Sequence, residues 1–389
     1  MNMKLHVLLV CGLLALTGPA QALDLWGSVK GVFSSDKSKS KAEEAKTEEG
    51  ETSSPPAAQP AAAVTTALDP APGVADLEME SFLDQRIWPK KDLAVMKKVV
   101  VGGFRVAFAT KATVSDSVRA SYLPGGINKS GVNSKIELSL EGIDLQRMQA
   151  LADKAYQDFL AQLKANSVEL LPYADFAAHP SFAEIEAAKQ KDGQPYTVTH
   201  EGRTYVVLSP SGMKLWFDQA EALGDQGAFG WGNGRRAGDF AFDNQALVLN
   251  PLLVVDFAET ASARNKGLFG VRDESDVEAK AGMSLRKSNT LLYVRGRAAP
   301  IASAVMGGVA YLKENVVFAG RYGQLNMGEM SSNRGLVTGL ALVGLSAGPV
   351  RTNQKGVMQA DPVRFETYAS NLLLSGNRLF ARAIGDLYR

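Results

Sequence analysis

Ser211 and Lys214 form the pattern in this 389-residue chain that most directly suggests catalysis. S-x-x-K is typical of serine acyl-transfer enzymes, in which one helical turn brings the lysine amine beside the serine hydroxyl that it activates. The later elements of that pattern are missing, because Lys129-Ser130-Gly131 precedes the serine and Ser331-Ser332-Asn333 matches S-x-N only loosely. Two fixed positions among four recur easily by chance. We therefore favour the start of a surface helix over Ser211–Leu223, and a periplasmic serine hydrolase using Ser211 and Lys214 stays as the catalytic alternative.

The Gly-rich stretch Gly224–Asp239 is the second candidate site, because it combines aromatic and basic side chains. It lacks the G-K-[ST] of a phosphate-binding P-loop and the strand-to-helix context of a dinucleotide fingerprint. As a ligand-binding module it would stack rings on a sugar or hold an anionic group, using Phe229, Trp231, Arg235 and Arg236. Dense glycine mainly indicates flexibility. The alternative is therefore a surface loop that its aromatic residues anchor to the core.

The histidines and clustered carboxylates form no recognisable metal or acid–base pattern. His179 precedes Pro180, His200 lies in a predicted hairpin turn, and neither has a second ligand at metal spacing. We interpret both as turn or capping residues. Four carboxylates close in sequence lie at the ends of predicted strands, where such groups are usually solvated: Asp239, Asp243, Asp256 and Glu259. The sequence thus predicts neither a metal site nor a cofactor.

The overall charge of the chain is too small to predict binding to a strongly anionic partner. The formal net charge is +1 and the pI is about 7.7. Nucleic acid and an anionic membrane surface are therefore not predicted partners. After the N-terminal segment no stretch of 18 or more apolar residues occurs, so the sequence predicts no transmembrane helix.

The N-terminus has the layout of a secretory signal peptide, residues 1–22. Lys4 precedes the apolar run Leu5–Leu16, and Ala20-Gln21-Ala22 supplies the small residues of a cleavage site. Cys11 is the single cysteine and lies inside the apolar run, so the exported chain would contain neither a disulfide nor a thiolate metal site. We predict a periplasmic or secreted location, with outer-membrane association as an alternative.

Residues 23–75 are predicted to be a disordered linker. The stretch Ser34–Pro72 is low in complexity and buries too little apolar surface to offset its conformational entropy. The body, 76–389, is long enough for a sizeable core. It forms either one domain or two sub-domains, 76–210 and 211–389.

The clearest structural signal is a strand–helix–strand unit over Lys135–Tyr173. Residues 135–140 alternate as a half-buried strand does, and Val168–Leu171 reads as a buried strand. Between them, apolar residues recur at 3.6-residue spacing after Asp144, whose carboxylate suits an N-cap. The unit predicts an α/β fold, with α+β as an alternative, built on a mixed sheet with flanking amphipathic helices.

The remaining elements follow from shorter patterns. Asp361 and Pro362 suit the N-cap and first turn of a long C-terminal helix. The polar stretch Thr113–Ser134 is predicted to be a long loop, which in a compact domain is usually functional or mobile. Other predicted helices are Asp76–Met96 and Pro180–Lys191. The predicted strands, richest in the C-terminal half, are Lys98–Thr110, the hairpin Tyr196–Leu208, Ala246–Phe257, a second hairpin of Val277–Leu285 with Thr290–Arg297, and Asn315–Ala319.

This order of elements resembles the periplasmic α/β domain shared by the curli-secretion channel family and the TolB amino-terminal domain. The resemblance covers about Val99–Lys191 and the last helix, and it rests on topology. The chain lacks a lipobox and adds the strand Lys135–Leu140 and the hairpin Tyr196–Leu208, so no functional residue is carried over. The resemblance implies a non-enzymatic part in envelope assembly or export.

The predicted function is therefore that of an exported bacterial envelope protein that acts by binding. Its partner would be an envelope protein or polymer. The two alternatives are the hydrolase that uses Ser211 and Lys214 and the ligand-binding module in the Gly-rich stretch 224–239.

Overall fold

The computed structural model describes residues 70–86, 96, 98–118, 121–123, 127–129, 132–188, 190, 194–217, 232–263, 276–287, 290–296, 306–332 and 350–388. All of them belong to one compact unit, Thr65–Arg389. The predicted signal peptide and the predicted linker up to residue 69 lie outside the described residues, as do Phe229 and Trp231.

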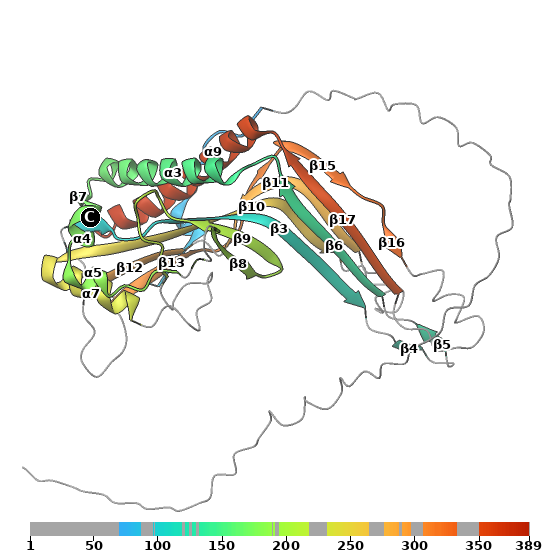
Figure 1. The fold of residues 1–389 in the computed structure, drawn as a ribbon, viewed down its shortest axis with the longest axis horizontal. Helices are drawn as coiled ribbons and strands as arrows, with labels where there is room; N and C mark the ends of the chain where they lie inside the picture. Colours follow the sequence, from blue (N-terminus) through green and yellow to red (C-terminus); the bar gives the residue numbers. More distant parts are fainter. Residues whose placement is uncertain are drawn as a thin grey trace, which may run out of the picture. The chain divides into compact units, whose positions relative to one another are not determined.

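A mixed sheet dominates the unit, so the predicted α/β class is confirmed (Figure 1). Across the sheet the order is β1 (Leu83–Arg86), β13 (Met306–Leu312), β12 (Thr290–Gly296), β10 (Ala246–Ala263), β3 (Arg105–Val118), β6 (Val132–Glu141), β17 (Val350–Ala360) and β15 (Gly323–Met327). Further strands pair at its sides: β2 (Lys98–Val101), β7 (Glu169–Leu171), β8 (Tyr196–His200), β9 (Arg203–Leu208), β11 (Asp276–Leu285), β14 (Val316–Ala319) and β16 (Ser331–Ser332). β4 (Ser121–Leu123) and β5 (Ile127–Lys129) form a separate pair.

Two long helices form where the sequence predicts them, because each has a local start signal. In α3 (Leu145–Ala165) the Asp144 carboxylate accepts a hydrogen bond from the backbone N–H of Arg147 at 2.8 Å. In α9 (Pro362–Gly385) Asp361 caps Arg364 in the same way at 2.9 Å. α3 buries one face through Met148, Leu151, Ala152, Ala155, Phe159 and Leu163. Among the described helices, none is both long and apolar enough to cross a membrane.

α3 and α9 pack side by side on the sheet and run parallel to each other (Figure 1). Arg147 of α3 forms an ion pair with Glu366 near both N-termini. Further along, Asn377 of α9 donates to the carbonyl oxygen of Ala155 at 2.7 Å. The short helices α1 (Met79–Phe82), α4 (Tyr173–Ala177), α5 (Pro180–Ala183) and α7 (Asn233–Asn244) complete the described part.

The sheet divides where β3 and β10 separate. The two strands pair in parallel over Arg105–Phe108 and Leu252–Val255. Beyond that point β3 pairs with β9 and β6, whereas β10 pairs with β11. Figure 1 shows β3, β6, β17, β10 and β11 continuing past the region that the helices cover. Two layers of strands therefore extend from the body of the unit.

Gly102 and Gly103 separate β2 from β3, where the sequence predicts a bulge or a close backbone approach. A Cβ atom at Gly102 would lie 2.5 Å from Cγ1 of Val248 and 2.9 Å from Cε1 of Phe176. Both glycine N–H groups donate to the carbonyl oxygen of Leu249. The close approach is confirmed.

Three helix predictions are too long. Of Asp76–Met96 only α1 is helical before β1 begins, and of Pro180–Lys191 only Pro180–Ala183 is helical. Residues 211–217 of the predicted helix Ser211–Leu223 form a turn and then extended chain. The backbone there is held from outside, because Ala188 N–H donates to the carbonyl oxygen of Leu215 at 2.8 Å.

Two strand arrangements also differ from the prediction. The predicted loop Thr113–Ser134 contains the end of β3, the short strands β4 and β5, and the start of β6. β3 and β6 pair with each other over Lys111–Val118 and Val132–Ser139. The predicted hairpin of residues 277–285 with 290–297 is wrong. β11 and β12 both pair with β10, end to end, because the 18-residue β10 is long enough to accommodate both.

Candidate binding surface on β3, β6 and β17

Strands β3, β6 and β17 combine to form a polar sheet face, because their registers place polar residues in the same rows. β3 and β6 pair antiparallel, and β6 and β17 pair parallel. Since side chains alternate between the two faces of a sheet, every second row lies on the same side. Fourteen described positions share the outer side, and all are exposed or half-buried: Lys111, Thr113, Ser115, Ser117, Asn133, Lys135, Glu137, Ser139, Glu141, Arg351, Asn353, Lys355, Val357 and Gln359. We call these residues the basic face.

The name describes the charge of these fourteen positions. Four of them are basic, Lys111, Lys135, Arg351 and Lys355, and two are acidic, Glu137 and Glu141, which gives a net charge of +2. The whole chain carries only +1. The sheet thus brings basic residues of β3 and β6 beside those of β17, which lies more than 200 residues later in the sequence.

Glu137, an acidic residue of the basic face, interacts with two basic neighbours. Lys135 Nζ lies 2.5 Å from Glu137 Oε1, and Lys355 is the cross-strand partner of Glu137. The hydrogen bond and the charge of Lys135 lower the pKa of the Glu137 carboxyl. Glu137 is therefore a carboxylate at neutral pH and orients Lys135 along β6.

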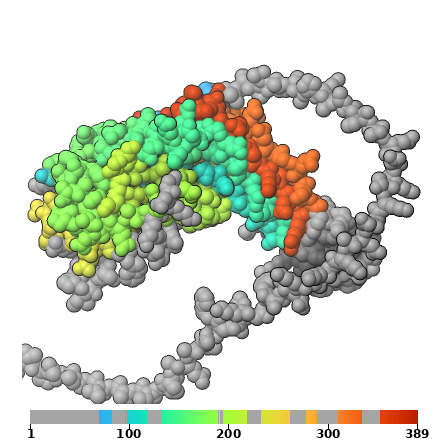
Figure 2. All heavy atoms as spheres, in the orientation of Figure 1, coloured from blue at the N-terminus to red at the C-terminus, as the bar shows by residue number. Residues whose placement is uncertain are grey.

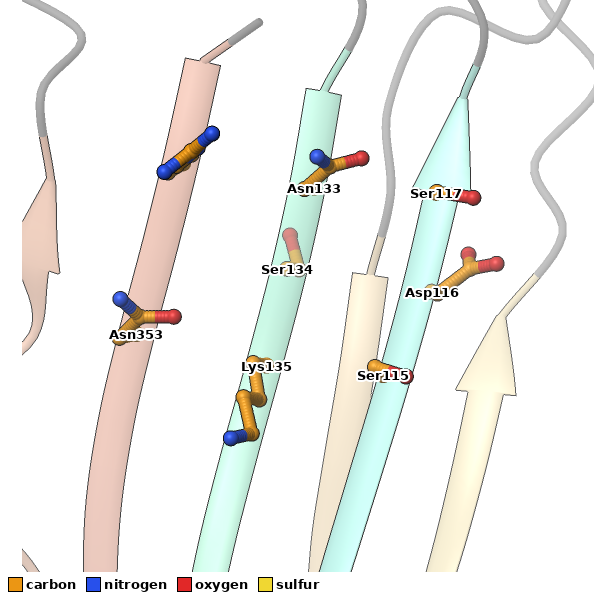
Figure 3. A pocket seen from close by; sticks show the side chains of 8 residues that line it. Ser115, Asp116, Ser117, Asn133, Ser134, Lys135 and Asn353 are labelled. Atoms are coloured by element: carbon orange, nitrogen blue, oxygen red, sulfur yellow. The ribbon is translucent and has the colours of Figure 1, made fainter. Parts of the chain in front are cut away.

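A hollow of about 520 Å³ opens beside the ends of the same strands (Figure 3). Two rows of the basic face line it, Ser117–Asn133–Arg351 and Ser115–Lys135–Asn353, together with Asp116 and Ser134 from the row between them. Hydroxyl, amide, carboxylate and basic groups can both donate and accept hydrogen bonds. The hollow therefore suits a polar partner better than an apolar one.

The reverse side of the three strands fixes them in place. Ala112, Ile136, Leu138 and Met358 alternate with the basic face and are buried in the core. The β11 strand packs against this side, where β11 contacts both β3 and β6. β6 and β17 are exposed side by side in Figure 2. A rigid sheet thus presents the basic face.

Ser211 and Lys214 are each engaged by other groups. Ser211 Oγ donates to Asp153 Oδ2 at 2.8 Å, and Ser211 N–H donates to Asp153 Oδ1 at 2.7 Å. Lys214 Nζ donates to the carbonyl oxygens of Phe182 at 2.9 Å and Ile185 at 3.1 Å, and burial lowers its pKa. The serine anchors its turn to α3 and the lysine caps the chain after α5.

The Gly-rich stretch is partly helical, because α7 begins at Asn233. Arg235 is exposed on α7, whereas Arg236 forms an ion pair with Glu184 at 2.6 Å. The buried Asn233 side chain bonds Glu186 in both directions, accepting at 2.9 Å and donating at 3.1 Å. The described end of the stretch is therefore attached to the body of the unit.

His179 takes part in a Ser–His–Asp arrangement that sequence spacing does not reveal. Its Nδ1 lies 2.7 Å from Ser181 Oγ and its Nε2 lies 3.3 Å from Asp243 Oδ2. Ser181 is only 7 % exposed, and its hydroxyl also donates to the carbonyl oxygen of Arg236 at 2.9 Å. Because a nucleophile must reach its substrate, this set fits a cap that joins α5 to α7. The capping prediction for His179 is confirmed, since its side chain accepts from Ser181 N–H.

Asp256 is buried, so the prediction of a solvated strand end is wrong for this residue. Its side chain is 1 % exposed and forms an ion pair with Arg203 of β9, while Arg286 lies 3.9 Å away. Burial raises the pKa of the Asp256 carboxyl, and the charges of Arg203 and Arg286 oppose this change. The strand interior was missed because the pairing of β10 with β3 and β11, and the approach of Arg203 from β9, depend on distant residues.

Comparison of the chain with protein-family models, curated proteins and solved structures gave no match in any of the three.

Proposed function

We propose that this chain is an exported bacterial envelope protein that acts without catalysis, by binding an anionic partner through the basic face in envelope assembly or export. One observation carries the proposal: a net charge of +2, with four basic side chains, on a polar, exposed face of three strands in a chain of nearly neutral net charge. Clustered charge of one sign raises the local concentration and the association rate of a partner of the opposite sign.

The state of the candidate catalytic groups supports binding over catalysis. Ser211 Oγ and Lys214 Nζ bond different groups, Asp153 and two backbone carbonyls, so neither activates the other. Ser181 is buried beside His179. The predicted signal peptide and the resemblance in element order to periplasmic assembly domains favour the envelope as the place of action.

The test is retention of envelope components by the immobilised mature chain. A variant with Lys135→Gln, Arg351→Gln and Lys355→Gln loses three charges from the basic face. A matched control with Lys164→Gln, Lys280→Gln and Lys287→Gln loses three exposed charges elsewhere.

We expect the basic-face variant to retain its partner at least about tenfold more weakly, from roughly 0.5 kcal/mol per exposed contact. The control variant should bind like the wild type, and added salt should weaken wild-type binding. Equal binding by both variants would contradict the proposal. Loss of function in Ser211→Ala alone would favour the hydrolase.

A further inference from the structure

A second hollow, of about 740 Å³, lies between the N-terminal halves of α3 and α9. Both helices contribute its lining: Asp144, Gln146, Arg147, Ala150, Leu151, Lys154, Val363, Glu366, Thr367, Ser370 and Asn371. It is separate from the basic face, because none of these residues belongs to β3, β6 or β17. We call it the helix groove.

The helix groove exposes aliphatic surface that a folded protein usually covers. Val363 is 69 % exposed, and Ala150 of α3 is exposed as well. Exposed aliphatic groups inside a groove offer surface that a bound segment can cover.

The described chain before α1 already follows the same side of α9. Arg382 donates to Asp76 and to the carbonyl oxygen of Leu77, and Ser375 Oγ accepts from Ala75 N–H at 2.9 Å. Asn371, which lines the helix groove, donates to the carbonyl oxygen of Pro72 at 2.8 Å. As the residue number falls from 77 to 72, the contact on α9 moves from 382 to 371, toward the helix groove.

The distance along α9 matches the distance that the preceding chain covers if that chain is extended. Eleven helical residues rise about 16 Å, and five extended residues span about the same distance. From Asn371 to Val363 the helix rises about 12 Å more, which four extended residues cover. Counting four residues back from Pro72 leads to Leu68, the largest aliphatic residue of the stretch Thr65–Asp69.

We propose that the helix groove is the docking site of the chain's own residues 65–69, with Leu68 covering Val363. The direction of residues 72–77, the match of lengths and the exposed side chain of Val363 all support this occupant.

Disulfide trapping tests the proposal in the full chain, with Cys11 replaced by Ser. Leu68→Cys with Val363→Cys is the test pair, and Leu68→Cys with Val317→Cys is the matched control, since Val317 is an exposed valine on β14. We expect rapid oxidation within one chain for the test pair and little for the control. Crosslinks only between chains would assign the groove to a second copy, and absence of a preferred crosslink would assign it to another partner. Either result overturns the proposal.

Maleimide labelling gives a second readout that does not depend on disulfide geometry. In Val363→Cys, the further change Leu68→Asp should raise the labelling rate about tenfold or more, whereas Leu68→Met should not change it. Equal labelling rates in all three proteins would contradict docking. Val363 is 69 % exposed, so the changes at this position are expected to leave the fold intact.

Discussion

The ion pair of Arg203 and Asp256 offers the sharpest test of the fold, because it lies close to where the sheet divides. The two side chains are 7 % and 1 % exposed. Removing one partner leaves the other charge buried, which typically costs about 3–5 kcal/mol. Since small domains unfold with roughly 5–15 kcal/mol, either single substitution would remove a large part of the stability.

The surroundings of the pair set the expected size of each effect. Without Arg203, the Asp256 carboxylate keeps the N–H of Phe257 at 2.9 Å and Arg286 at 3.9 Å. Without Asp256, Arg203 keeps Thr260 Oγ1 at 2.7 Å. We therefore expect Arg203→Met and Asp256→Leu each to cost about 3 kcal/mol, near the lower end of the range for such pairs.

The double variant Arg203→Met with Asp256→Leu separates an ion pair from two independent contacts. It buries no charge at this position, so its cost should be at least about 2 kcal/mol below the sum of the single costs. The assay is equilibrium unfolding in urea, monitored by tryptophan fluorescence, to which the buried Trp216 contributes. The exposed pair Glu278–Lys280 is the control, and Lys280→Gln should cost less than about 0.5 kcal/mol. Additive single costs, or a single cost below about 1 kcal/mol, would refute the reasoning.

Three further changes test other parts of the structure. Phe159→Ala should lower the free energy of unfolding by about 3–5 kcal/mol, because Phe159 is a buried aromatic residue. Asp158→Ala, next to it but partly exposed, should lower it by less than about 0.5 kcal/mol. Equal urea midpoints for the two variants would mean that the buried face of α3 has been assigned wrongly. Gly102→Ala should cost about 1–3 kcal/mol by overpacking against Val248, measured in the same way. Burial acts to raise the pKa of the Asp153 carboxyl, but the hydrogen bonds of this carboxyl outweigh burial, and its pKa is lowered. The Asp153 carboxylate therefore contributes to stability fully above its unfolded-state pKa of about 4. This contribution is lost as the pH falls through the lower folded-state pKa. The stability difference between the wild type and Asp153→Asn should therefore shrink in acid.

The two long helices, α3 and α9, could be predicted well because their signals are local. Asp144 and Asp361 lie directly before the helices that they cap, and the apolar spacing of α3 and α9 repeats over many turns. The hairpin of β8 and β9 was equally local, with a two-residue turn at Glu201-Gly202. These predictions needed no information from distant residues.

The basic face could not be predicted, because no short stretch contains it. Residues 113–134 looked like a polar loop, so the end of β3 and the start of β6 were missed, although residues 135–140 of β6 were predicted as a strand. The β17 strand, V-R-T-N-Q-K-G-V-M-Q-A, has too few apolar residues to stand out as a strand. The signal that could have extended β3 is the alternation of Ala112 and Val114 with polar neighbours.

The pairing of β17 with β6 also determines when the basic face comes into existence. Val350 pairs with Val132, and the two residues are 218 positions apart in the chain. Contacts so distant in sequence form slowly, because the loop between them must close first. Synthesis delivers β6 long before β17, so the growing chain holds an unpaired β6 edge and an incomplete charge cluster. Partner recognition is thereby delayed until the last strand has been made, and a truncated chain would be recognised poorly even if its helix α3 had formed.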